Sequence, residues 1–112
     1  MVRVRFSEQA KADVREAIVN TIRGWGPHKA QEYRDLLREA RSRLAREPHC
    51  GIAHPEIHPE LRIYRIEQRG RHARHALLYR VAANGTVQVA RCLYDGMDYA
   101  RHLPSEFGKD DE

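Results

Sequence analysis

The chain has 112 residues, 41% of them hydrophobic and 32% charged, which fits one domain with a modest core and excludes a predominantly disordered chain. Charged residues or His interrupt every apolar run, and Val2–Phe6 alternates apolar with basic residues, so we expect neither a membrane span nor a signal peptide and place the protein in the cytoplasm. The net charge of +4 is compatible with an acidic partner, but 16 acidic residues are interleaved with the 20 basic ones, so charge alone does not indicate a nucleic-acid binder.

Residues 2–6 predict a short strand, because apolar residues alternate with Arg over this stretch. Ser7 predicts the N-cap of a helix that ends near Gly24. Steps of three and four residues give this helix one apolar stripe, formed by Val14, Ala17, Ile18, Thr21, Ile22 and Trp25. The break at Trp25-Gly26-Pro27 precedes a second helix, from about His28 to about Arg46. The short connection predicts an antiparallel helical hairpin.

Residues 47–60 are rich in Pro and Gly, and we expect no regular structure there. Three strands are predicted next, over residues 61–68, 74–82 and 86–94, and Asn84-Gly85 is a strong signal for a tight turn between the last two. A short helix is predicted within residues 97–103. We expect one domain over residues 1–104 and a flexible acidic tail over residues 105–112.

The predicted element order is β-α-α-β-β-β. We therefore expect an α+β fold in which an N-terminal strand and an antiparallel helical hairpin precede a three-stranded antiparallel sheet. Packing both helices on one face of a mainly antiparallel sheet would bury the apolar stripe of each helix.

The sequence contains few groups with the spacing of a metal, cofactor or nucleophilic site. His49, His54 and His58 lie in a proline-broken stretch without paired Cys or a nearby Asp, so we interpret them as loop residues and expect no metal. Cys50 and Cys92 are expected to be free thiols in a reducing compartment. No phosphate-binding loop, dinucleotide fingerprint or nucleophile elbow is present, and we expect no cofactor.

One catalytic alternative stays open on the predicted sheet. A metal-free ribonuclease can use Arg and Tyr side chains around a scissile phosphate for charge stabilisation and proton transfer. Arg65, Arg80 and Tyr94 are the candidates for such a site. The residue pattern favours the other interpretation, an ordinary solvated strand surface.

Five segments occur in an order and spacing that resemble the ParE toxins of type II toxin–antitoxin modules, a branch of the RelE/ParE superfamily. They are a Trp-Gly helix break, an A-x-x-Y-x-x-x-L helix, an L-A-x-x-P exit, a strand ending in Leu-Tyr-Arg and a final strand ending in R-x-L-x-x-x-M-D. These segments are Ile22–Gly26, Ala30–Leu37, Leu44–Pro48, His75–Val81 and Val89–Asp98. The resemblance extends over nearly the whole chain and implies the same helical hairpin on an antiparallel sheet.

Departures from the superfamily pattern favour the ParE branch over the RNA-cleaving RelE branch. Tyr94 stands where the family usually has His, and Ala76 where the RelE branch tends to have a basic residue. Asp95 and Asp98 follow the last strand, where carboxylates would repel a phosphate backbone. The resemblance therefore implies a non-enzymatic inhibitor of DNA gyrase, with ribosome-dependent mRNA cleavage as the alternative.

The resemblance also implies the partners of the protein. They are DNA gyrase and a cognate ParD-like antitoxin, which would join the toxin in a hetero-oligomer, with no membrane contact and no sequence-specific nucleic-acid binding. We expect an antitoxin segment that folds on binding to lie along the edge between the helices. The antitoxin-binding candidates are Trp25, Tyr33, Arg34, Leu37 and Arg41. A core role for Trp25, Tyr33 and Leu37 is the alternative.

Target-binding candidates lie on the basic sheet and in the C-terminal segment. They are Arg74, Arg91, Asp98, Arg101 and His102. The alternative for the C-terminal segment is a structural lid in which Met97 and Leu103 cover one end of the sheet. A family member that binds only its antitoxin, without toxicity, is a third functional class.

Overall fold

The computed structural model describes residues 1–68, 71–94 and 98–107, apart from the side chains of residues 67, 68 and 71–74. The elements in chain order are β1 (Val4–Phe6), α1 (Glu8–Trp25), α2 (Pro27–Arg46), β2 (Ile52–Ala53), β3 (Arg62–Gln68), β4 (Arg71–Val81), β5 (Val87–Tyr94) and α3 (Tyr99–His102). The predicted α+β order is confirmed. Among the described residues, no helix has the length and apolar character needed to cross a membrane.

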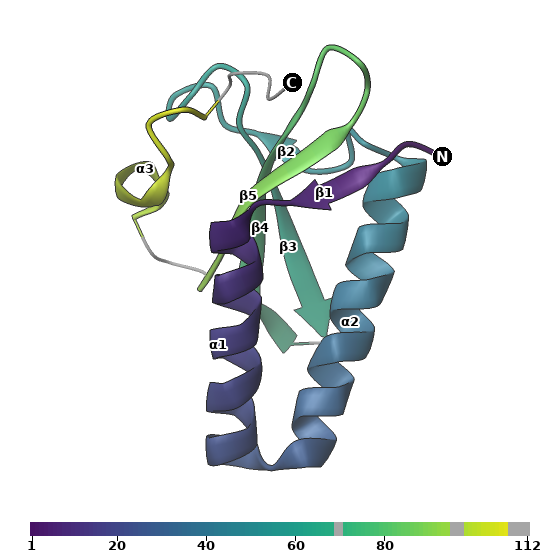
Figure 1. Cartoon of the computed structure of the whole chain (residues 1–112), viewed down its shortest axis with the longest axis vertical. Helices are drawn as coiled ribbons and strands as arrows, with labels where there is room; N and C mark the ends of the chain where they lie inside the picture. Colours follow the sequence, from purple (N-terminus) through teal and green to yellow (C-terminus); the bar gives the residue numbers. More distant parts are fainter. Residues whose placement is uncertain (69–70, 95–97, 108–112) are drawn as a thin grey trace.

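Local signals in the sequence determine where the helical hairpin begins and turns. The Ser7 hydroxyl caps α1 by accepting a hydrogen bond from the Ala10 amide at 3.0 Å, and it donates to the Ala90 carbonyl of β5 at 2.7 Å. Gly26, at φ 86°, occupies a conformation that favours glycine and ends α1. Pro27 then opens α2 at its first position. The two helices lie side by side and antiparallel (Figure 1).

The sheet has the order β1-β5-β4-β3-β2. The three long strands β3, β4 and β5 pair antiparallel, as predicted, and β1 adds to the edge of β5 in parallel. The prediction of no regular structure over residues 47–60 is wrong, because β2 pairs antiparallel with β3, with Ile52 opposite Ile63. The three residues between Gly51 and Pro55 contain neither Pro nor Gly, and two of them, Ile52 and Ala53, form β2. The high Pro and Gly content of the surrounding stretch had argued against any strand there.

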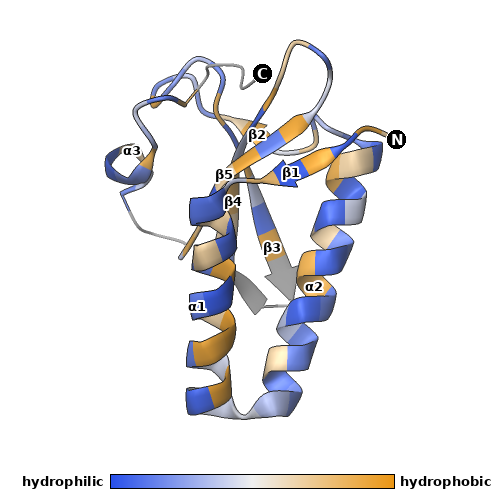
Figure 2. Cartoon of the chain, in the orientation of Figure 1, coloured by the Kyte–Doolittle hydropathy of each residue, from blue (hydrophilic) through white to orange (hydrophobic). Residues whose placement is uncertain are grey.

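The hairpin covers one face of the sheet and buries the main core against it. The buried residues of this cluster come from β1, both helices and strands β3 to β5, and Ala10, Leu44, Leu77, Tyr79 and Val87 are among those with almost no exposure. Figure 2 shows apolar and polar residues alternating along both helices, as expected for helices with one buried side. This layer fixes the position of α1 relative to β5.

The opposite face of the sheet carries a second apolar cluster, formed by Leu61, Ile63, Ala76, Leu78 and Leu93. The loop residue Ile57 and three residues of the C-terminal segment, Tyr99, Leu103 and Phe107, pack against it. Leu103 thus covers this face, as the lid alternative predicted, whereas Met97 lies outside the described residues. Packing continues to Phe107, three residues beyond the expected domain boundary at 104.

The loop between α2 and β3 is fixed to the sheet by Tyr79. Its hydroxyl donates to the Pro48 carbonyl at 2.7 Å and accepts from the Gly51 amide at 2.8 Å. Arg62 donates to the carbonyls of His49 and Gly51 at 2.9 and 2.6 Å. These bonds hold the loop whose later residues contact the C-terminal segment.

Candidate functional site

The tip of the hairpin presents apolar side chains to solvent. Val19, Ile22 and Trp25 are 43%, 41% and 64% exposed. The last turns of α1 extend past the described strands (Figure 1), so no sheet lies beneath them. The expectation that packing on the sheet buries the whole apolar stripe of α1 is therefore wrong for Ile22, and for Trp25 the exposure contradicts the alternative of a core role. Exposed apolar side chains grouped on one helix end are typical of a protein-binding surface.

Two of the predicted antitoxin-binding residues belong to the core. Tyr33 is buried, its hydroxyl lies 3.5 Å from Cys92 Sγ, and its ring meets the His75 ring edge-on at 5.0 Å. Burial raises the pKa of Tyr33 far above its ordinary value. Leu37 is half-buried against the main core. For these two residues, the alternative of a core role describes the observed environment.

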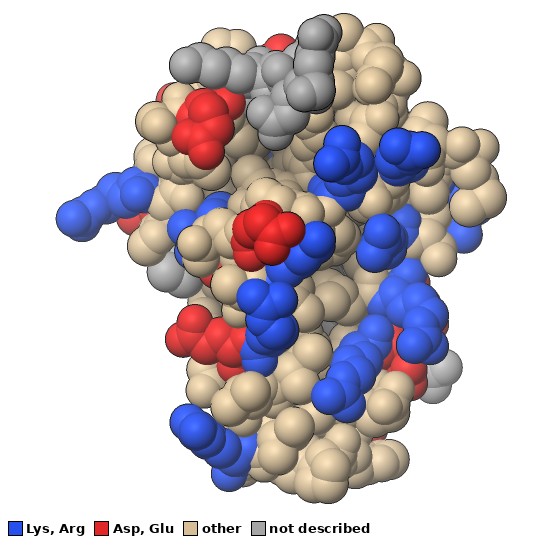
Figure 3. Space-filling model, viewed as in Figure 1, with Lys and Arg blue, Asp and Glu red and all other residues tan. Residues whose placement is uncertain are grey.

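The remaining antitoxin candidates lie on an exposed basic surface. Arg34 and Arg41 of α2 are exposed, and so are Arg3 and Arg5 of the N-terminal strand region. Arg41 donates to the Val4 carbonyl at 3.0 Å and lies over the Phe6 ring. In Figure 3, Lys and Arg side chains spread over the face formed by the hairpin and β1, with fewer acidic side chains among them. This face is complementary to an acidic partner.

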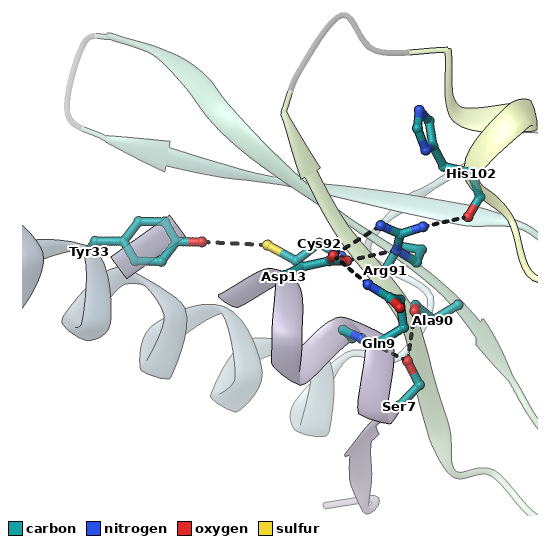
Figure 4. A network of polar contacts seen from close by, with 9 residues as sticks. Ser7, Gln9, Asp13, Tyr33, Ala90, Arg91, Cys92 and His102 are labelled. Atoms are coloured by element: carbon teal, nitrogen blue, oxygen red, sulfur yellow. Dashed lines mark hydrogen bonds and ion pairs between the residues drawn. The ribbon is translucent and has the colours of Figure 1, made fainter. Parts of the chain in front are cut away.

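A buried ion pair joins α1 to the sheet (Figure 4). Arg91 of β5 donates from Nε to Asp13 Oδ2 at 2.8 Å and from Nη2 to Asp13 Oδ1 at 3.0 Å. The Asp13 side chain is 8% exposed and that of Arg91 is 18% exposed. Asp13 also accepts from the Cys92 amide at 3.0 Å and from Gln9 at 3.2 Å. The bidentate geometry is the strongest form of this interaction.

The same guanidinium reaches the C-terminal segment, because Arg91 Nη1 donates to the His102 carbonyl at 3.1 Å. Burial by itself would raise the pKa of Asp13, but the hydrogen bonds from Arg91, the Cys92 amide and Gln9 outweigh it and lower that pKa. The hydrogen bond to Asp13 raises the pKa of Arg91. The pair is therefore ionised over the whole neutral pH range.

Among the predicted target-binding residues, Asp98 and Arg101 are exposed and His102 is half-buried. Asp98 precedes α3 and makes no capping hydrogen bond with its side chain. Arg91 differs from them, since its guanidinium is engaged by Asp13 and His102. Arg74 lies in β4, and its side chain is outside the described part of the structure.

The three residues of the ribonuclease alternative do not converge. Arg65 is opposite Ala76 and Tyr94 is opposite His75, two adjacent residues of β4, so their side chains lie on opposite faces of the sheet. The Tyr94 ring lies 4.4 Å from the His75 ring on the face covered by the helices, whereas Arg65 is on the face of Leu61 and Ile63. Arg80 lies four residues along β4 from Ala76, about 13 Å away. It is 5% exposed and bonded to Glu60 at 2.8 Å and Gln88 at 2.6 Å.

Sequence reasoning did not identify Asp13. One signal was available, because Asp13 lies between Ala10 and Ala17 on the side of α1 that faces the sheet, where a carboxylate requires a partner. In the described ranges, no group of three or more His, Cys, Asp or Glu side chains is arranged to hold a metal ion. Both cysteines are free, and burial raises the pKa of Cys92 to about 11.

A helical hairpin on one face of a mixed five-stranded sheet places the protein in a class of small α+β domains. Residues 4–99 match the family model of the ParE toxin of type II toxin–antitoxin systems, parDE. Toxin ParE1 of Mycobacterium tuberculosis is 37% identical over 101 residues, in strains CDC 1551 and H37Rv alike, which covers 90% of this chain and 97% of the relative. The chain belongs to the ParE toxin family.

A solved structure of the chromosomal ParDE TA system from P. aeruginosa has the same fold. It superposes with a TM-score of 0.69 and covers 84% of this chain and 96% of its own, at 20% sequence identity. The fold is thus shared by sequences that differ at most positions.

Proposed function

We propose that this ParE-family toxin arrests growth by binding DNA gyrase, without catalytic residues of its own, and is neutralised by a ParD-like antitoxin in the cytoplasm. The observation that carries the proposal is the ParE family match over residues 4–99, because the ParE branch implies gyrase as the target. The separation of Arg65, Arg80 and Tyr94 supports a binding function over phosphodiester cleavage.

The antitoxin docks on the hairpin surface, which we define as Val19, Ile22, Trp25, Arg34 and Arg41. The three apolar side chains provide anchors for an amphipathic segment, and the two exposed arginines attract its acidic residues. Trp and Arg are the residue types that most often dominate binding energy at protein interfaces. Tyr33 is buried and Leu37 is half-buried in the main core, so neither belongs to this surface.

The target contacts the C-terminal segment, residues 98–107, through Asp98, Arg101 and His102. These residues follow β5 in sequence and are held by packing of Leu103 and Phe107 on the sheet. A folded segment that presents charged side chains can bind a protein partner with little loss of conformational entropy.

The test is supercoiling of a relaxed plasmid by purified bacterial gyrase and ATP, with increasing toxin, beside translation in a cell-free extract. Loss of supercoiling with intact translation is the expected result. Intact supercoiling with cleaved mRNA would refute the gyrase target and support the ribonuclease alternative. If neither activity changes and the chain still binds its antitoxin, the third class, an antitoxin binder without toxicity, describes it.

The hairpin surface is tested by antitoxin affinity in a titration with the cognate antitoxin. Trp25→Ala is expected to raise the dissociation constant by about tenfold or more, since it removes a large exposed anchor. Ile52→Ala is the matched control, because it also removes a large exposed apolar side chain, 69% exposed, but from β2 and not from the hairpin. Unchanged affinity for Trp25→Ala would exclude the hairpin tip as the docking site.

A further inference from the structure

We propose that the Asp13–Arg91 ion pair positions the C-terminal segment, residues 98–107, for contact with the target, so that Arg91 acts through this segment without touching the target. This inference rests on the proposed function and names residues that control its target-binding surface. It assigns Arg91 a positioning role in place of the direct contact expected from sequence.

The first step of the argument is that one guanidinium joins three elements. Arg91 in β5 holds Asp13 of α1 in a bidentate pair and donates its third hydrogen bond to the His102 carbonyl at the end of α3. Asp13 is 78 residues from Arg91 in sequence, and His102 is 11 residues from it. The planar fork of Arg spreads its N–H donors over three nitrogens and reaches all three acceptors at once, whereas Lys carries its three donors on one nitrogen and cannot reproduce this geometry.

The second step is that the pair is built as a fixed support. Asp13 receives further hydrogen bonds from the Cys92 amide and Gln9, so its carboxylate is held from the sheet and from α1. Both charged side chains are largely shielded from water, which strengthens the pair and its hydrogen bonds. The orientation of the guanidinium toward His102 is therefore determined by Asp13.

The third step concerns what else holds the segment. Tyr99, Leu103 and Phe107 pack on the second apolar cluster, and Phe107 meets the His58 ring edge-on at 4.8 Å. Apolar packing is non-directional, so it holds the segment on the sheet without fixing its rotation. The bond from Arg91 to the His102 carbonyl supplies a directional contact beside Asp98 and Arg101, the exposed residues proposed to meet the target.

The experiment compares Arg91→Lys and Asp13→Asn with the wild-type toxin. Arg91→Lys keeps the charge but loses the fork, and Asp13→Asn keeps the shape but loses the charge. Arg38→Lys is the matched control, an exposed Arg paired with Asp35 at 3.6 Å on α2. Hydrogen exchange of peptides covering residues 98–107 and of peptides from α2 is measured by mass spectrometry, together with antitoxin affinity, gyrase inhibition and growth arrest.

Both variants are expected to accelerate exchange in residues 98–107 by about tenfold, since a charge-assisted hydrogen bond is lost, while exchange in α2 and antitoxin affinity stay within about twofold of wild type. The toxin concentration for half inhibition of gyrase should rise by about tenfold, with weaker growth arrest. Arg38→Lys should match the wild type in every readout. Because Arg91→Lys keeps the positive charge, faster exchange in this variant would show that the geometry of the guanidinium, and not its charge alone, positions the segment.

Unchanged exchange in residues 98–107 would overturn the positioning role. Equal acceleration in α2, or a parallel loss of antitoxin affinity, would also overturn it, because the pair would then stabilise the whole fold. Failure of wild-type toxin to inhibit gyrase would refute the proposed target instead. In that case, the exchange data and growth arrest still decide whether the pair positions the segment that causes toxicity.

Discussion

Substitution of Gly51 by Ala tests how tightly the loop after α2 is fixed to the sheet. A Cβ at this position would lie 2.6 Å from the Tyr79 hydroxyl, 2.7 Å from Tyr79 Cε1 and 3.0 Å from the Ile63 carbonyl. Tyr79 is fully buried, so its ring has little room to move away. Overpacking of this kind costs about 1–3 kcal/mol, and any shift of the ring also breaks the bonds of its hydroxyl to Gly51 and Pro48.

Removing the hydroxyl alone has a separate cost that can be estimated. Tyr79→Phe leaves the buried Gly51 amide and the Pro48 carbonyl without this partner, which costs about 1–3 kcal/mol. In the double variant Gly51→Ala/Tyr79→Phe, the contact of the new Cβ with the Tyr79 hydroxyl no longer exists. The hydrogen bonds of that hydroxyl are also counted in the cost of each single variant but are lost only once in the double variant. We therefore expect Gly51→Ala and Tyr79→Phe together to cost less than the sum of the two single changes, by about 1 kcal/mol.

Urea unfolding followed by circular dichroism measures these free energies, with the slope of the transition as a check on two-state behaviour. Gly24→Ala is the matched control, because it makes the same substitution within α1, where a Cβ would meet no atom within 4 Å. That change is expected to stabilise the protein by up to about 1 kcal/mol. Strictly additive costs for Gly51 and Tyr79, or a Gly51→Ala cost below about 0.5 kcal/mol, would refute the close packing described here.

Three further outcomes follow from the structure. The pKa of Asp13 is lowered in the folded state, so the ion pair stabilises the fold above the ordinary Asp pKa of 3.8. That contribution to the free energy of unfolding is lost as the pH falls through the lower folded-state pKa, so the stability of Asp13→Asn should fall less steeply with pH below about pH 4. Titration with a thiol reagent at pH 8 should modify Cys50 well before the buried Cys92, whose pKa is about 11, and Cys50→Ser should remove the fast phase. In thermal melting, the free energy of unfolding of Trp25→Ala should lie within about 0.5 kcal/mol of wild type, because the Trp25 side chain is 64% exposed. A larger loss of stability would place Trp25 in the core.

The element order was predictable from local sequence signals. Ser7, Gly26, Pro27 and the Asn84-Gly85 turn each act within a few residues of where they stand, and the structure places helix and strand ends within one to three residues of the positions they indicate. Residues 61–68 and 86–94 were likewise predicted as strands, and they form β3 and β5. Such signals operate locally, which is why they survive without knowledge of the tertiary fold.

Burial along the hairpin was predicted less well, because a helical stripe shows which side of a helix is apolar but not how far its neighbour extends. Trp25 and Tyr33 illustrate this, since both lie on apolar stripes, yet Tyr33 is buried over the sheet and Trp25 projects past it. The partner of Asp13 was also beyond sequence reasoning. Arg91 is one of many arginines in the chain, and only the tertiary fold brings it to Asp13 across 78 residues.

The hairpin surface and the ion pair that supports the C-terminal segment both involve α1, and this has a consequence for neutralisation. Asp13 and Trp25 both belong to α1, about 18 Å apart along a continuous helix. Coupling between the two through α1 would be reciprocal: if antitoxin binding loosened the Arg91 bond to His102, then Asp13→Asn, which breaks the pair, would change antitoxin affinity by the same factor. Because we expect Asp13→Asn to leave antitoxin affinity within about twofold of wild type, we also expect antitoxin binding at the hairpin to leave hydrogen exchange in residues 98–107 within about twofold of the free toxin, whereas steric masking of the target surface would slow it further. Slower exchange on antitoxin binding would show that the two surfaces are covered together and not coupled through α1.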